Sequence, residues 1–174
     1  MNLLKAYAKP YLLTKKFKKT EDSVLNFPMS VKDFKAKSVA CVVSCENSFV
    51  GMRNSLELLG FEVACSTSMA ATFEAVIESP KDWALVLVRL DQPIDEVGME
   101  KYVRNLRLLD TNIPVVVVAE KGGSPMRTGA PTLIADLAVK EPRSVMELSE
   151  VLIRAVSART TWGSSFKHYR RYAS

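Results

Sequence analysis

From Val39 onward, short apolar segments alternate with amphipathic ones, and this alternation is the clearest pattern in the sequence. Five segments are mostly apolar, as is typical of strands covered on both faces of a sheet. These predicted strands are 39–43, 61–66, 83–88, 114–119 and 136–139. Because helical or loop segments separate them, rather than tight hairpin turns, the strands are predicted to be parallel.

The intervening segments carry apolar residues at the three-to-four spacing of amphipathic helices. The first helix is predicted to begin at a cap on Asn47 or Ser48 and to end at Gly60. The second is predicted to begin at Ser68 and to end before Pro80. The apolar faces of these two helices contain Phe49, Met52, Leu56, Leu59, Phe73, Val76 and Ile77.

Two more helices and one irregular stretch complete the pattern. Residues 126–134 contain Gly129 and Pro131, so any helix there is short or broken. Ser144 and Glu147 have capping-box spacing and open the last helix. The apolar positions of the third and last helices are Met99, Tyr102, Val103, Leu106, Leu109, Leu148, Leu152 and Val156. The whole pattern predicts an α/β fold, a doubly wound five-stranded parallel sheet with the flavodoxin-like order 2-1-3-4-5.

The charge distribution divides the 174 residues into three parts. Residues 1–38 contain nine lysines and three acidic residues, and residues 159–174 contain four basic and no acidic residues. Residues 39–158 contain eleven basic and sixteen acidic residues. A basic N-terminal arm (1–38) and a basic, aromatic C-terminal tail (159–174) are therefore predicted to flank an acidic α/β domain (39–158). Such asymmetry bears on partners rather than on the fold.

The sequence indicates neither membrane insertion nor export. The apolar runs 83–88 and 113–119 are far shorter than the roughly 20 residues of a membrane-spanning helix. The N-terminal arm lacks the continuous apolar region of a secretory signal. The three cysteines, Cys41, Cys45 and Cys65, lie in or beside predicted strands. We expect small buried thiols in a reduced, cytoplasmic protein, and interpret Cys45 as buried rather than reactive.

The residue patterns predict no enzyme, metal centre or cofactor. Gly122-Gly123-Ser124 lacks both glycine spacings of nucleotide-binding loops and is interpreted as a turn. There is no Cys or His spacing typical of zinc, and the single histidine, His168, lies outside the predicted domain.

The ends of the predicted strands carry the most informative residues, which are Ser44, Cys45, Arg89, Ala119 and Lys140. In these positions, and in the strand and helix order of 39–158, the chain resembles the receiver domains of bacterial response regulators. Glu46-Asn47 after the first strand and Pro93, four residues after Arg89, support this alignment.

The resemblance implies a receiver scaffold that has lost its phosphotransfer chemistry. Receivers have an acidic pair where this chain has Ser44 and Cys45, a phosphate-accepting aspartate at Arg89, and a threonine or serine at Ala119. Only the lysine at the end of the fifth strand is retained, as Lys140, and Glu141-Pro142 follows it where receivers usually have a proline directly. Since carboxylate oxygens hold Mg²⁺ in such sites, we expect no Mg²⁺ and no aspartyl phosphate.

Two interpretations of Arg89 remain open. Its guanidinium makes a standing ion pair with Glu46, Asp91 or Glu141, which fixes the scaffold in one state. Alternatively, Arg89 lies on a loop and its head reaches water.

Three surfaces are candidates for binding a partner. The N-terminal arm interleaves apolar residues with basic ones, among them Lys15, Lys16, Lys18 and Lys19. The C-terminal tail carries Trp162, Tyr169, Arg170 and Arg171. By resemblance, receivers meet partners on the face formed here by 126–156, which includes Met126, Arg127 and Leu137.

These observations lead to one main hypothesis and several alternatives. The main hypothesis is a non-enzymatic, phosphorylation-independent pseudo-receiver that binds a protein partner in a bacterial signalling or regulatory complex. Basic arms with interspersed aromatic residues also suit nucleic acid, and less well an anionic membrane surface. A homodimeric regulator, a structural subunit of a larger assembly and solvated tails are the remaining alternatives.

Overall fold

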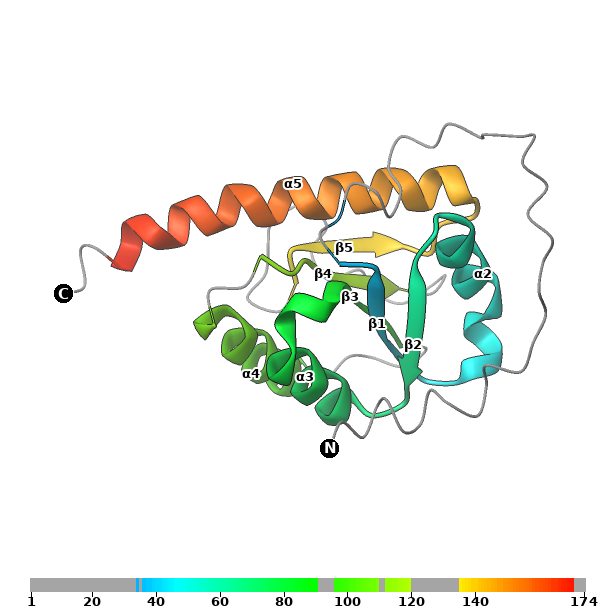
Figure 1. The fold of residues 1–174 in the computed structure, drawn as a ribbon, viewed down its shortest axis with the longest axis horizontal. Helices are drawn as coiled ribbons and strands as arrows, with labels where there is room; N and C mark the ends of the chain where they lie inside the picture. Colours follow the sequence, from blue (N-terminus) through cyan, green and yellow to red (C-terminus); the bar gives the residue numbers. More distant parts are fainter. Residues whose placement is uncertain (1–33, 35, 91–95, 110–111, 120–134, 171–174) are drawn as a thin grey trace.

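A five-stranded parallel sheet with the order β2-β1-β3-β4-β5 forms the centre of the molecule (Figure 1). The structure is a computed structural model, and it describes residues 34, 36–90, 96–109, 112–119 and 135–170. The predicted doubly wound fold and its strand order are confirmed. The strands are β1 (Ser38–Val43), β2 (Glu62–Ser66), β3 (Trp83–Leu90), β4 (Val115–Ala119) and β5 (Leu137–Lys140).

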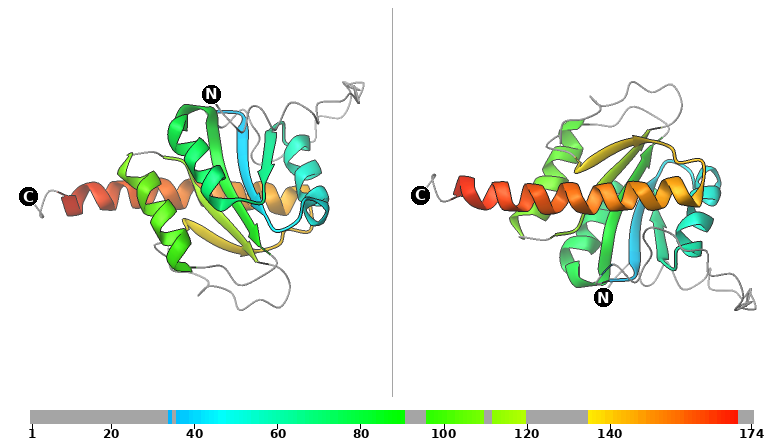
Figure 2. Two further views of the ribbon diagram at one scale, coloured as in Figure 1. Left: turned by 90° about the horizontal axis from the view of Figure 1, so that it is seen from below. Right: turned by 90° about the horizontal axis from the view of Figure 1, so that it is seen from above.

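Helices cover both faces of this sheet (Figure 2). One face packs against α2 (Val50–Leu58) and α5 (Val145–Arg170), and the other against α3 (Met69–Glu78) and α4 (Glu96–Leu108). Two short 3₁₀ helices, η2 (Glu46–Phe49) and η3 (Pro80–Asp82), precede α2 and β3. The predicted stretch 126–134 lies outside the described residues.

The core consists of two apolar clusters, one on each face. Strand β3 contributes to both, because successive side chains of a strand point to opposite faces. Leu85 and Leu87 belong to the cluster under α2 and α5, and Val86 and Val88 to the cluster under α3 and α4. This alternation explains why the strand is continuously apolar in sequence, and it assigns position 89 to the α2 and α5 face.

Local sequence signals account for most helix ends. Gly60 adopts a φ of 93° after α2, where Phe61 N–H donates to the Leu56 carbonyl at 3.0 Å. Ser68 Oγ caps α3 by accepting from Ala71 N–H at 3.2 Å, as predicted.

The predicted cap of the first helix on Asn47 or Ser48 is wrong. Helix α2 has Phe49 at its N-cap and no side-chain hydrogen bond there. The 3₁₀ turn η2 runs directly into α2, so the helix has no separate N-terminus for Asn47 or Ser48 to cap. Leu109 is also exposed rather than part of the buried face, because α4 ends at Leu108.

The described structure extends past both predicted boundaries of the α/β domain. Phe34 packs edge-on against Phe61, with ring centroids 5.1 Å apart, although its sequence position falls in the N-terminal arm. Ser144 Oγ accepts from Glu147 N–H at 3.1 Å at the start of α5. This helix continues through residue 158 to Arg170 and projects beyond the sheet (Figure 1).

Candidate functional site

The carboxyl edge of the sheet brings the predicted strand-end residues together. Val43, Arg89, Val118 and Val139 form one row across β1, β3, β4 and β5. Ser44 and Cys45 follow Val43 directly in the sequence, while Ala119 and Lys140 pair in the next row. Residues far apart in the chain therefore line one edge, as the alignment of strand ends predicts.

These edge residues differ in their exposure. Ser44, Cys45 and Lys140 are exposed, Ala119 is half-buried, and Arg89 is only 4% exposed. The interpretation of Cys45 as a buried residue is wrong. Strand β1 ends at Val43, so Cys45 lies in the connection to η2 and outside the covered sheet.

Arg89 lies within β3, since the strand continues one residue further, to Leu90. Alternate residues of a strand point to the same face of the sheet, so Arg89 lies on the face of Leu85 and Leu87, which α2 and α5 cover. There its Nε lies 3.2 Å from Glu141 Oε1, and its Nη2 lies 3.3 Å from Glu141 Oε2. The interpretation that Arg89 reaches water from a loop is therefore wrong, and the ion pair with Glu141 is present.

This ion pair has two unequal partners. The Arg89 side chain is 4% exposed, whereas that of Glu141 is 32% exposed. A buried guanidinium needs a charged or hydrogen-bonding partner, because transfer of an uncompensated charge from water is costly. The two parallel contacts match the planar fork of arginine to a carboxylate. The pair joins the central strand to the connection between β5 and α5.

The edge residues do not fit Mg²⁺. Ser44, Cys45, Arg89 and Ala119 supply no carboxylate, and Arg89 engages the carboxylate of Glu141. A hard cation of this kind requires several oxygen ligands and few positive neighbours. Across the part of the chain that the structure describes, no three His, Cys, Asp or Glu side chains come together as metal ligands.

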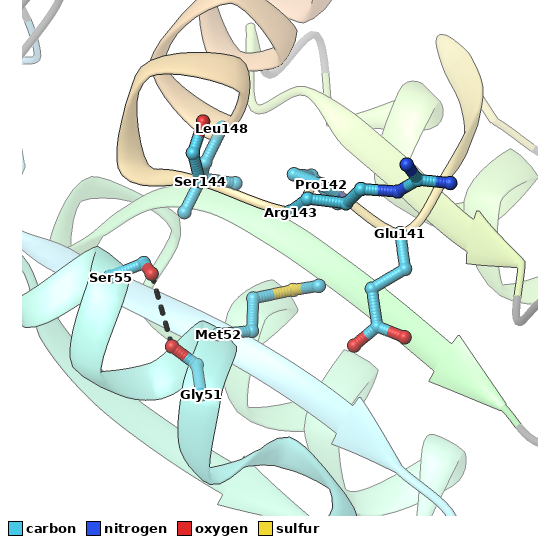
Figure 3. A pocket seen from close by; sticks show the side chains of 8 residues that line it. All are labelled: Gly51, Met52, Ser55, Glu141, Pro142, Arg143, Ser144 and Leu148. Atoms are coloured by element: carbon cyan, nitrogen blue, oxygen red, sulfur yellow. Dashed lines mark hydrogen bonds between the residues drawn. The ribbon is translucent and has the colours of Figure 1, made fainter.

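A small pocket of about 170 Å³ lies beside the Arg89–Glu141 pair. Figure 3 shows Met52 and Glu141 extending into the space between α2 and the β5–α5 connection, whereas Arg143 points away from the Glu141 carboxylate. A methyl group on Gly51 would contact no atom within 4 Å, so the space in front of this residue is open. The pocket is smaller than the roughly 300 Å³ of typical small-molecule sites, and suits a single side chain of a partner. Its walls are Gly51, Met52, Ser55, Glu141, Pro142, Arg143, Ser144 and Leu148.

A second ion pair, which the sequence patterns do not indicate, joins the half-buried Arg107 to the buried Asp136 at the amino edge of the sheet. Asp136 Oδ2 also accepts from Val115 N–H at 2.7 Å, and Arg107 Nη1 donates to the Ile113 carbonyl at 2.8 Å. Burial lowers the pKa of Arg107 to about 10 against the opposing effect of Asp136, and nearby Arg159 lowers it further. Asp136 was predicted to lie in the fifth strand, but β5 begins one residue later, at Leu137.

Only some of the remaining partner-binding candidates lie among the residues that the structure describes. Leu137 is half-buried in β5 and packs against the cluster under α2 and α5. Trp162, Tyr169 and Arg170 lie on α5, and their side chains are outside the described part. The candidates outside the described residues are Lys15, Lys16, Lys18, Lys19, Met126, Arg127 and Arg171.

Comparison with known proteins gives matches among solved structures alone. No protein-family model matches the sequence, and no curated protein matches it. A response regulator receiver domain protein from Clostridium thermocellum superposes with a TM-score of 0.52 and 14% identity, covering 72% of this chain and 98% of that one. FixJ-N superposes with a TM-score of 0.50 and 26% identity, covering 69% of this chain and 93% of that one.

This chain has the fold of a response-regulator receiver domain. The resemblance inferred from the strand ends is thereby confirmed for the fold. NtrX from Brucella abortus, in complex with ADP, contains a similar region with a TM-score of 0.55 and 14% identity. That match covers 80% of this chain and 30% of NtrX. Within the described residues of this receiver-like chain, no helix is both long and apolar enough to cross a membrane.

Proposed function

We propose that this receiver-like protein is a non-enzymatic, phosphorylation-independent interaction module in a cytoplasmic bacterial signalling or regulatory complex. The receiver fold of its structural neighbours supports a signalling or regulatory role. The observation that carries the proposal is the ion pair between Arg89 and Glu141.

The chemistry of Arg89 argues against phosphate transfer at this position. A guanidinium has five N–H donors and no acceptor, and it stays protonated in proteins, so it offers no nucleophilic oxygen to a phosphoryl group. Its charge is neutralised by Glu141 within the protein rather than by a ligand. The contact fixes the β5–α5 connection to β3 without any modification, which favours a scaffold held in one state.

The pocket beside this pair supports the recognition of a partner's side chain. It opens between α2 and the start of α5, and the neighbouring residues Val50 and Met146 are large exposed apolar residues. A protruding apolar side chain of a partner protein would fill the space in front of Gly51. Arg143, exposed at the rim, adds a cation that suits an acidic neighbour of that side chain.

Phosphorylation tests the first part of the proposal. We expect the full-length protein, incubated with acetyl phosphate and Mg²⁺, to acquire no hydroxylamine-labile phosphate, as measured by intact mass. A receiver domain with its acidic residues in place serves as the positive control. A labile adduct on the folded protein would contradict the proposal.

Capture of partners from a bacterial lysate tests the second part. Gly51→Trp adds a large side chain at the wall of the pocket without a collision at the new Cβ, because that position is open. We expect this variant to lose a protein captured by the wild type, with circular dichroism unchanged. Leu58→Trp is the matched control, since Leu58 is 69% exposed on the same helix and does not line the pocket. Equal loss in both variants would argue against recognition through the pocket.

Binding of nucleic acid is the second candidate function, favoured by the continuation of α5. Residues 159–170 form one helix with the part of α5 that packs against the sheet, and this stretch contains basic and aromatic residues and no acidic residue. Contacts between basic side chains and nucleic-acid phosphates weaken steeply as the salt concentration rises. Fluorescence anisotropy with single-stranded DNA and RNA at increasing salt measures this, and salt-independent or absent binding favours the protein-interaction module.

A further inference from the structure

Cys41 and Cys65 lie opposite each other on neighbouring strands. Strands β1 and β2 pair in parallel, and Cys41 and Cys65 are register partners. Both side chains belong to the apolar cluster under α2 and α5, so they lie on the same face of the sheet. Neither is in a disulfide, and Cys45, the third cysteine, is exposed in the connection after β1.

The spacing of the two strands is compatible with a covalent bond between these sulfurs. Neighbouring strands lie about 4.8 Å apart, within the range of about 4.4–6.8 Å between Cα atoms of disulfide-bonded cysteines. Burial raises the pKa of the Cys41 thiol, and Cys65 is close enough to Cys41 to raise it further. A disulfide needs no rearrangement of the strand register.

The two thiols differ in their access to solvent. Cys41 lies on the inner strand β1 and is fully buried, whereas Cys65 lies on the edge strand β2 and is half-buried. Burial, and then the hydrogen bond with Cys65, raise the pKa of the Cys41 thiol. A small oxidant from solvent therefore reaches Cys65 first, and Cys41 is the adjacent thiol.

We propose that Cys41 and Cys65 form a redox-active pair that a peroxide oxidises to a reversible cross-strand disulfide. Cys65 loses its proton, its thiolate attacks one oxygen of hydrogen peroxide, the O–O bond breaks, and the hydroxide that leaves takes up a proton to become water. The resulting sulfenic acid on Cys65 is then attacked by the sulfur of Cys41, the S–O bond breaks, and a second water leaves. Together the two thiols lose two electrons and two protons, and the peroxide is reduced to two molecules of water.

A cellular dithiol reverses this bond by thiol–disulfide exchange, in which a thiolate attacks one of the two sulfurs. Access from solvent is through Cys65, which is half-buried on the edge strand β2. The disulfide would join the edge strand to β1 only while the oxidant persists. This modification is independent of the proposed interaction module.

Peptide mapping of the oxidised full-length protein tests the proposal. Trypsin releases Cys41 together with Cys45 in peptide 38–53, and Cys65 in peptide 54–81. After treatment of the dilute, folded protein with hydrogen peroxide and alkylation of remaining thiols, we expect these peptides to be linked, with a loss of two hydrogen atoms. Dithiothreitol should separate them.

Two variants identify the bonded cysteines. Cys45→Ser should retain the linked peptides, and Cys65→Ser, at a half-buried position, should abolish them. Loss of the link in Cys45→Ser would overturn the proposal, because Cys45 would then be the partner. A sulfinic acid on Cys65 without a link would also overturn it. The proposal would also be overturned if all three cysteines of the folded protein could still be alkylated after a dose of peroxide that oxidises the urea-unfolded protein.

Discussion

The two edges of the sheet each hold an arginine bonded to a carboxylate, but the two pairs are built differently. At the amino edge, Arg107 and Asp136 are 18% and 6% exposed, and both are also fixed by backbone hydrogen bonds. At the carboxyl edge, Arg89 is buried but Glu141 is 32% exposed and lies on the wall of a pocket. The amino-edge pair is thus enclosed, whereas the carboxyl-edge pair has one side open to a partner.

This difference separates a structural contact from a candidate functional one. Asp136 holds the start of β4 through Val115 and the end of α4 through Arg107, so its carboxylate serves two elements at once. The Glu141 carboxylate holds Arg89, and it comes from a connection rather than a strand. A partner that contacts Glu141 would act on the carboxyl edge without disturbing the amino edge.

The largest expected effect comes from breaking the enclosed pair. Asp136→Ala removes the buried carboxylate beside Arg107 and leaves that half-buried guanidinium near Arg159, so we expect a loss of about 3–5 kcal/mol in the free energy of unfolding. Asp136→Asn keeps an oxygen that can accept from Val115 N–H, and should cost less, about 1–3 kcal/mol. Urea unfolding followed by circular dichroism measures both. Losses below about 1 kcal/mol in both variants would remove the distinction between the edges.

An intermediate loss of stability is expected at the carboxyl edge, and its size depends on which partner is removed. Glu141→Ala leaves the buried Arg89 without this carboxylate, and should cost about 1–3 kcal/mol. Arg89→Met should cost less, because the Glu141 carboxylate is partly exposed and can turn to water. Replacing both residues by methionine should be close to neutral. The same urea unfolding measures the three variants, and equal losses for the single changes would show that Glu141 is as enclosed as Asp136.

The smallest expected effect concerns the open side of the carboxyl edge. Gly51→Ala adds a methyl group that meets no atom within 4 Å, and it removes a helical glycine. The free energy of unfolding should rise by about 0.5 kcal/mol, through lower entropy of the unfolded chain and better helix propensity. Thermal unfolding measures this, with Leu58→Ala on the exposed face of α2 as the comparison. A clear destabilisation by Gly51→Ala would mean that the pocket closes over this residue.

The sequence allowed the elements and their order to be predicted, because each depends on local patterns. Gly60 and Ser68 act through backbone geometry within a few residues, and both predictions were confirmed. Arg89 was recognised as informative because it follows an apolar run. Its burial was not predicted, because a polar residue at that position is also typical of an exposed strand end. The structure shows that β3 includes it.

Contacts between distant elements were beyond the reach of these patterns. Arg107 and Asp136 are 29 residues apart, and their pairing depends on how α4 ends against the start of β5. Cys41 and Cys65 meet only through the register of β1 and β2. The continuation of α5 past residue 158 was missed because Thr160, Thr161 and Gly163 are weak helix formers.

The 26 residues of α5 span about 39 Å at the helical rise of 1.5 Å per residue. Its first part is anchored by Leu148 and Leu152, which are buried against the sheet, while its end at Arg170 stands clear of it (Figure 2). A continuous helix transmits a change in tilt along its whole length, so a sub-ångström shift at Leu152 becomes a displacement several times larger at Arg170. Any molecule attached near that end would sense movements of the sheet that are too small to alter its packing.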